Sequence, residues 1–370
     1  MWKSAKKPLL AALCAALIVA AVVAVRVSRQ RASALTLVVV YGSEKRGWME
    51  EVAPLFKSEW SSRHPDKPLQ LKLIPMGSRE SVNQMLLGEI KPAVWSPASS
   101  IWIPYANYLW EEEYGYPLVE DWEPLVYSPI VIGTWETYRD EYNITGFESL
   151  HRLAEDPDAG LKFAHTDPRL SNSGMMALIL EVSAAAGKPP SELTVDDLLR
   201  EDVFEWLSEL EARAVFYGES TGFLADQAAS SGPQSINAFV VYENLIIEKN
   251  RQGEPQARWG EKIVAVYPEE GTLMSDHPYC ILNAPWVTPE LREAAEELLD
   301  FLRRPEIQKL AIKHGFRPSV PGVELDPSVF SPENGVRMDI PCPILSSEVD
   351  GEVMARITDL WTACRFGGGG

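Results

Sequence analysis

Short apolar runs alternate along the chain with stretches of helical periodicity. The runs over 35–40 (LTLVVV), 69–74 and 129–133 are short and rich in aliphatic residues, which predicts strands buried on both faces. Helical patterns follow the first two runs, beginning near Trp48 and Ser81. Strands that alternate with helices indicate an α/β fold with parallel sheets.

A second series of strands and helices extends over 162–267, and the pattern changes near Pro278. A helix is expected from Thr288 and Pro289, because Thr is a favoured N-cap and Pro a favoured first helical residue. Another helix is expected from Pro305 up to Gly315, and the rest of the chain is expected to be mostly loop. It has one last helix near 352–361 and ends in four glycines that should be flexible.

The N-terminal end carries an unbroken apolar run over 9–25, flanked by lysines and arginines. This run is long for a signal-peptide core and short for a membrane-spanning helix. Ala32-Ser33-Ala34 offers a small-residue cleavage site, although three arginines lie close to it. We expect residues 1–34 to form an uncleaved membrane anchor, with a cleaved signal peptide as the alternative. Either one places the rest of the chain outside the cytoplasm.

The formal charge of −19 is unevenly distributed, because the six charged residues of 1–34 are all basic. The remaining chain therefore carries 28 Lys and Arg against 53 Asp and Glu. Such an acidic body repels nucleic acid and anionic lipid headgroups, so the only expected membrane contact is the N-terminal segment. A length of 370 residues suits one large or two mid-sized domains.

Three cysteines follow the N-terminal segment, and export from the cytoplasm permits a disulfide. Cys342 and Cys364 lie in one C-terminal stretch and could close a loop, whereas Cys280 is expected to be buried in or beside a strand. No Cys-x-x-Cys or Cys/His spacing typical of zinc is present. The sequence therefore predicts no metal site and no cofactor.

Serine, threonine and glycine follow four of the predicted strands, each time just before a helix. Ligands of open α/β sheets bind beyond the carboxyl ends of strands, where helix N-termini present free backbone N–H groups. If the four loops meet in one cleft, they form a neutral cage for a small polar or anionic ligand; otherwise each is an ordinary helix cap. The candidate ligand-binding residues in these loops are Ser43, Ser99, Ser100, Thr166, Ser173, Gly174 and Thr221.

These loops belong to a longer series of motifs, which lie in one order along 35–361. They are Tyr41-Gly42-Ser43-Glu44-Lys45, Ser96-Pro97-Ala98-Ser99-Ser100, the segment from His165 to Gly174, Tyr242-Glu243-Asn244, Tyr267-Pro268 and the segment from Lys313 to Pro318. Together the motifs resemble those of extracellular solute-binding proteins with the type II periplasmic binding fold. The resemblance is to the molybdate-binding-like branch, some members of which continue into a von Willebrand type A domain.

The resemblance implies two lobes, each a mostly parallel sheet flanked by helices, that close on a solute by hinge motion. We expect lobe one to span 35–128 and 278–362, lobe two 129–277, and a flexible tail 363–370. An ABC-type permease is the partner that the resemblance implies, with a membrane-anchored sensor or interaction module as the alternative. Matched positions imply ligand contacts from Ser43, Ser99, Ser173 and Tyr242.

One motif favours an enzyme instead. Residues 218–222 (GESTG) match the G-x-S-x-G of serine hydrolases, with a strand before and a helix after. Ser220 would be the nucleophile, with Asp276 and either His277 or His314 as partners. An early oxyanion loop such as His-Gly-Gly is absent from the sequence, so the motifs favour binding without catalysis.

Overall fold

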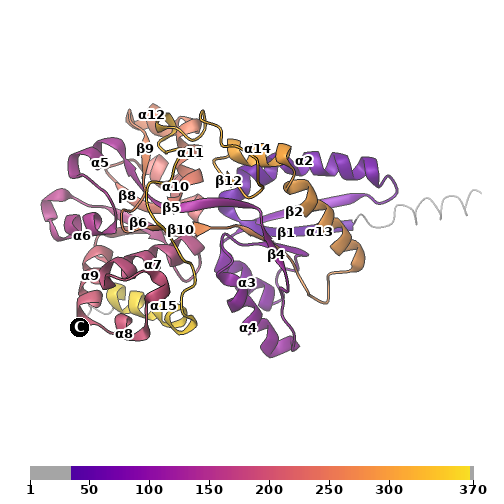
Figure 1. Ribbon diagram of the computed structural model, residues 1–370, viewed down its shortest axis with the longest axis horizontal. Helices are drawn as coiled ribbons and strands as arrows, with labels where there is room; N and C mark the ends of the chain where they lie inside the picture. Colours follow the sequence, from indigo (N-terminus) through magenta and orange to yellow (C-terminus); the bar gives the residue numbers. More distant parts are fainter. Residues whose placement is uncertain (1–34, 367–370) are drawn as a thin grey trace, which may run out of the picture.

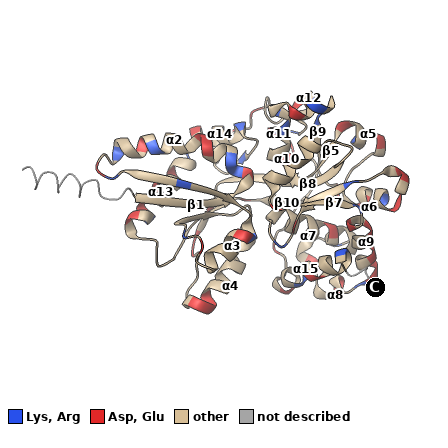
Figure 2. Ribbon diagram, turned by 180° about the vertical axis from the view of Figure 1, so that it is seen from behind, with Lys and Arg blue, Asp and Glu red and all other residues tan. Residues whose placement is uncertain are grey.

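The computed structural model describes residues 35–366, which form two α/β lobes side by side (Figure 1). The predicted anchor or signal peptide lies outside the described residues. Within 35–366, no helix is both long and apolar enough to cross a membrane. Acidic and basic residues are spread over the helices of both lobes (Figure 2).

The first lobe is built on β1 (Leu35–Gly42), whose aliphatic run is buried on both faces of a five-stranded sheet. Leu37 and Val39 pack in one apolar cluster with the helices over 46–63 and 289–302, and Val40 packs on the other face with those over 78–86 and 102–114. The other strands are β2 (Leu69–Met76), β3 (Val94–Ser96), β4 (Trp122–Pro124) and β11 (Pro278–Ile281). The helices are α2 (Arg46–Arg63), α3 (Ser78–Leu86), α4 (Trp102–Tyr114), α13 (Pro289–Leu302) and α14 (Pro305–Lys313).

The helix expected from Thr288 and Pro289 is α13. The hydroxyl of Thr288 accepts a hydrogen bond from the backbone N–H of Leu291 at 3.3 Å, so Thr288 is its N-cap.

The second lobe is built on β5 (Val126–Trp135), to which four further strands pair. Its other strands are β6 (Phe163–Thr166), β7 (Ala214–Gly218), β8 (Ala238–Tyr242), β9 (Ile263–Val266), β10 (Thr272–Ser275), β12 (Arg317–Pro318) and β13 (Ile344–Leu345). Its helices are α5 (Glu136–Tyr142), α6 (Phe147–Glu155), α7 (Asn172–Ala186), α8 (Val195–Leu198), α9 (Glu201–Glu211), α10 (Thr221–Ser231), α11 (Glu243–Gln252), α12 (Glu254–Trp259) and α15 (Gly351–Phe366).

The two-lobed α/β architecture is as predicted, but both sheets are mixed. The strands joined by helices within one lobe are parallel: β1 to β2 and β3, and β6 to β7 and β8. The strands that cross from the other lobe run against their neighbours, as β5 does to β8 and β11 to β3. A strand that enters from the opposite lobe arrives from the other end of the sheet, which reverses its direction.

The C-terminal segment differs from its expected place in lobe one. Strand β13 pairs with β10, and α15 packs against α8 and α9 at the base of the second lobe (Figure 1). The apolar stripe of α15, which includes Val353, Ile357 and Trp361, is buried there. An amphipathic pattern shows that a helix needs an apolar partner, but it does not show which lobe provides that partner.

The predicted bridge between Cys342 and Cys364 is wrong, because all three cysteines of the described chain are free thiols. Cys342 lies before β13, while Cys364 lies in the last turns of α15 and donates to the carbonyl oxygen of Phe204 at 3.7 Å. Burial raises the pKa of both thiols to about 11, which keeps them protonated. Cys280 is fully buried on β11, as predicted.

Candidate functional site

A narrow crevice lies where the two lobes meet, and in this closed arrangement it leaves no room for a water-sized sphere. Its lining comes from both lobes and is mostly hydroxyl, amide and backbone, with one ionisable acid. The lining residues are Ser43, Glu44, Met76, Gly77, Ser78, Ala98, Ser171, Asn172, Ser220, Thr221 and Tyr242. The crevice is therefore polar, and with the lobes closed its walls lie almost in contact.

Three helices begin at this crevice: α3 at Ser78, α7 at Asn172 and α10 at Thr221. The first N–H groups of a helix have no acceptor within the helix, and the aligned peptide dipoles give that end a partial positive charge. The three N-termini thus direct donors and positive potential toward one small volume. This arrangement suits an anionic or strongly polar group.

A chain of buried hydroxyls supports the crevice on the side of lobe two. The Thr221 hydroxyl lies 2.7 Å from that of Ser173, which lies 2.8 Å from that of Thr166. Thr221 lines the crevice itself, whereas Ser173 and Thr166 stand behind it and are fully buried. These two predicted residues therefore position Thr221.

Gly174 holds the first turn of α7 against the end of β6. A β carbon at this position would lie well inside van der Waals contact with the carbonyl oxygen of Thr166, so no other residue fits without a shift of the backbone. The glycine is needed for close packing behind the crevice, and its side of the helix leaves no room for a ligand.

Tyr242 lies at the end of β8 and is fully buried. Its hydroxyl accepts a hydrogen bond from the side-chain amide of Asn172 at 2.9 Å, and the amide oxygen of Asn172 accepts from the indole of Trp102 at 2.8 Å. Trp102 belongs to lobe one and Asn172 to lobe two, so this network crosses the interface.

Further contacts hold the lobes together around the crevice. The Ser43 hydroxyl of lobe one accepts from the backbone N–H of Gly222 in lobe two at 3.4 Å. The side-chain amide of Asn244 donates to the carbonyl oxygen of Glu44 at 3.3 Å. The structure thus has the lobes closed on one another, with Ser43 at their junction.

Ser99 and Ser100, predicted with the others, do not line the crevice. The Ser99 hydroxyl accepts from the backbone N–H of Ile101 at 3.4 Å, just before α4. The backbone N–H of Ser100 donates to the Asp276 carboxylate at 2.8 Å. Both therefore stabilise the turn that leads into α4, whose N-cap is Ile101.

Several crevice residues were absent from the predicted set. Ser78 follows β2 and Gly77, so it repeats the pattern of a strand, a small residue and a helix that identified the other loops. Ser171 and Asn172 stand beside the predicted Ser173, within one of the motifs. A consistent use of the same signal would have found them.

A buried ionic group lies beneath the crevice. Lys45 Nζ lies 2.8 Å from the Glu44 carboxylate and 3.2 Å from His277 Nδ1, which itself lies 3.2 Å from Glu44. Burial alone would raise the pKa of Glu44, but Lys45 and His277 outweigh it and lower that pKa to about 2. Burial, with Lys45 nearby, also lowers the pKa of His277. The one ionisable acid of the crevice is therefore ionised and already paired with a cation.

The ion pair between Glu44 and Lys45 predicts that the stability of the protein depends on pH. The folded pKa of Glu44 lies below the usual 4.5, so its contribution is fully present above pH about 4.5 and is lost as the pH falls towards about 2. Unfolding free energies measured across this window should fall less steeply with acidification in Glu44→Gln than in the native chain. Equal slopes would contradict the paired state of Glu44.

In the structure, the three residues considered as partners of Ser220 in a hydrolase contact other groups. His277 faces Lys45 and Glu44, His314 lies 2.5 Å from Glu51 on α2, and Asp276 accepts from the Ser100 N–H. Within 35–366, no hydrogen bond joins Ser220 to a histidine. Ser220 lies instead at the N-terminus of α10, on the wall of the crevice.

Several solved structures similar to this chain are solute-binding proteins. A periplasmic thiamin-binding protein has a TM-score of 0.63 at 14% identity, covering 90% of this chain and 96% of its own. AfuA from Actinobacillus pleuropneumoniae, with fructose-6-phosphate bound, has 0.60 at 15%, covering 89% and 97%. The sulfate-binding protein SubI from Mycobacterium tuberculosis H37Rv has 0.55 at 18%, covering 78% and 88%. These similarities establish the fold.

No curated protein matches the chain. The family model for bacterial extracellular solute-binding proteins matches residues 37–317, which include most of both sheets and every residue of the crevice. The chain therefore belongs to the bacterial extracellular solute-binding proteins.

Proposed function

We propose that the chain binds a small anionic or strongly polar solute between its two lobes and delivers it to an ABC-type permease. We infer this class of ligand because three helix N-termini and several hydroxyl groups line one crevice. The acid that lines the crevice is paired with Lys45, which reduces its repulsion of an anion. Solved relatives of this fold include proteins named for thiamin, sulfate and a sugar phosphate, so the fold alone does not choose the ligand.

Closure of the lobes is the proposed mechanism. Direct contacts such as Ser43 with Gly222 hold the lobes together, so a solute enters only when they separate. We place the bending points where the chain crosses between sheets, from β4 to β5 and from β10 to β11. The ligand then shifts the population toward the closed form, because only that form offers donors from both lobes.

We further propose that residues 1–34 tether the protein to the membrane, or direct its export and are removed. The apolar run over 9–25 supports both versions. A place in the molybdate-binding-like branch rests on the order of the motifs. A role without catalysis is supported by the family, and by the engagement of His277 and His314 with groups other than Ser220.

The ligand class can be tested by a thermal-shift screen of the purified protein. The panel contains the anions sulfate, molybdate, phosphate and sugar phosphates. Neutral sugars and thiamin are included for comparison. We expect anions to raise the melting temperature and thiamin to leave it unchanged. A shift with thiamin alone would contradict the anionic assignment while leaving a solute-binding function in place.

Thr221→Val removes the crevice hydroxyl while nearly preserving side-chain shape. With an anion from the screen, we expect titration calorimetry to show binding weaker by ~1.5–3 kcal/mol, the usual contribution of a hydrogen bond to a charged group. Thr194→Val is the matched control, because Thr194 caps α8 away from the crevice and should change stability without changing affinity. Unchanged affinity in Thr221→Val would place the ligand elsewhere.

A further inference from the structure

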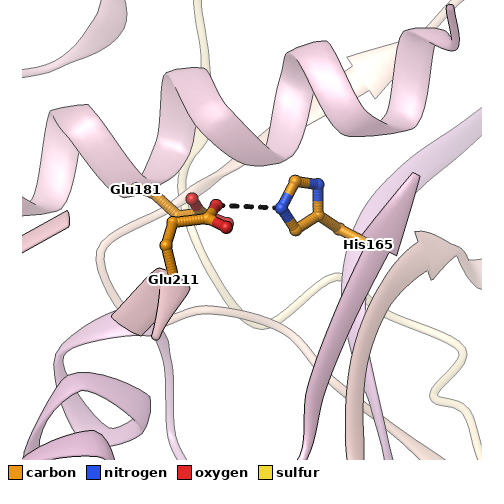
Figure 3. A group of neighbouring side chains, drawn as sticks. All are labelled: His165, Glu181 and Glu211. Atoms are coloured by element: carbon orange, nitrogen blue, oxygen red, sulfur yellow. Dashed lines mark hydrogen bonds and ion pairs between the residues drawn. The ribbon is translucent and has the colours of Figure 1, made fainter. Parts of the chain in front are cut away.

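Three ionisable side chains meet inside lobe two, away from the crevice (Figure 3). His165 comes from β6, Glu181 from α7 and Glu211 from the last residue of α9. One donor atom from each lies within 4.8 Å of the other two, and all three residues are fully buried. Their separation of many residues in sequence explains why no motif revealed them.

Glu181 is the unusual member of the group. Both of its carboxylate oxygens are buried and neither has a hydrogen-bond partner. The Glu211 carboxylate, by contrast, contacts His165 Nε2 at 2.9 Å through one oxygen and accepts from the Tyr217 hydroxyl at 2.5 Å through the other. A buried carboxylate without a donor is unfavourable unless it is neutralised, so the place beside Glu181 calls for a cation or a proton.

The ring of His165 is fixed in the orientation that metal ligands require. Its Nδ1 lies 2.8 Å from the carbonyl oxygen of Thr166, an acceptor that needs a proton on Nδ1. The lone pair of the neutral ring is then on Nε2, which faces the two carboxylates (Figure 3). A backbone carbonyl on the second ring nitrogen is the usual way in which proteins orient a metal-binding histidine.

We propose that His165 Nε2 and the carboxylates of Glu181 and Glu211 bind a divalent transition-metal ion such as Zn²⁺. A neutral imidazole with two carboxylates carries two negative charges, which one divalent cation cancels. Imidazole and carboxylate together suit zinc and neighbouring transition metals. The site would join β6, α7 and α9, so its role is structural rather than catalytic.

The protein surrounding this site is closed to solvent. The ring of Trp361 on α15 lies 6.3 Å from that of His165, and the ring of Tyr217 lies 5.0 Å from it on another side. A metal ion would therefore enter as the chain folds and leave slowly afterwards. The site is linked to the crevice only indirectly, because Thr166 contacts His165 through its carbonyl and Ser173 through its hydroxyl.

The test uses the full chain produced with zinc in the medium. We expect elemental analysis to find about one zinc ion per chain. Protein unfolded with a chelator and refolded without metal should melt at a lower temperature, and refolding with Zn²⁺ should restore the loss. Refolding with Co²⁺ should give visible d–d absorption without a thiolate charge-transfer band. The proposal would be overturned if the native protein contained no zinc and if added Zn²⁺ did not change its melting temperature. A proton would then be what neutralises the buried carboxylate.

Glu181→Gln removes one ligand with little change of shape. We expect it to bind zinc at least about tenfold more weakly, and its melting temperature should no longer respond to the metal. Glu205→Gln is the matched control, because Glu205 lies exposed on α9 and outside the cluster. If Glu181→Gln fails to fold, the zinc content and the cobalt spectrum of the native chain still decide the matter. Equal zinc binding by both variants would also contradict the assignment.

Discussion

Gly174→Ala is expected to lower the free energy of unfolding by about 3 kcal/mol, the upper part of the usual range for overpacking. The added methyl group would overlap the carbonyl oxygen of Thr166, which is backbone and cannot rotate away. Either α7 moves away from β6 or the end of β6 moves. Chemical denaturation with a fluorescence readout measures the loss directly.

Gly351→Ala provides the matched control. Gly351 also begins a helix, α15, but a β carbon there would meet no atom within 4 Å. Alanine should be tolerated at that position, because it has the higher helix propensity. Equal losses in the two variants would show that packing against Thr166 is not what requires glycine at 174. The displaced α7 should also weaken solute binding, since Asn172 and Thr221 line the crevice nearby.

The second large effect is expected at Lys45, which is fully buried against Glu44. Lys45→Met keeps much of the apolar side chain but leaves the carboxylate of Glu44 without its cation. Breaking a buried ion pair on one side destabilises a protein by about 3–5 kcal/mol, because an uncompensated charge stays in the interior. Denaturant unfolding at neutral pH should show a loss of this size.

Two further variants test the cause of that loss. The double variant Glu44→Gln, Lys45→Met removes both charges, so most of the stability should return. Lys67→Met breaks a pair with Glu293 in which both side chains are about half exposed, and such pairs contribute only ~0–1 kcal/mol. A double variant as unstable as Lys45→Met would mean that the shape of the lysine matters and its charge does not.

The sequence predicted the strands and the loops better than it predicted which loops face one another between the lobes. Runs such as 35–40 contain only residues that fit a sheet covered on both faces, so β1 followed from pattern alone. The Ser and Thr residues before helices were found for the same local reason. Ser99 carries an identical local signal and yet lies in the turn before α4 and away from the crevice, because only the packing of the two lobes decides which loops face one another.

The ionic groups could not be predicted, for a related reason. Lys45 and His277 are far apart in sequence and meet only because β3 lies between β1 and β11 in the first sheet. Glu181 resembles an ordinary helical acid until α7 turns it toward His165. The apolar residues all round Glu181 indicate that its helix is buried, but nothing local shows which side chains it meets there.

The return of the C-terminal segment to lobe two has a consequence for affinity. The chain crosses between the lobes from β4 to β5, from β10 to β11, and again between α14 and β13. Each lobe is thus a tethered partner of the other, held at a high effective concentration even when the crevice is open. A solute does not have to bring two separate lobes together. It needs only to bind the closed arrangement more tightly than the open one. Its apparent affinity then depends on how often the empty protein already closes, so crossing segments far from the crevice can tune binding without touching the solute.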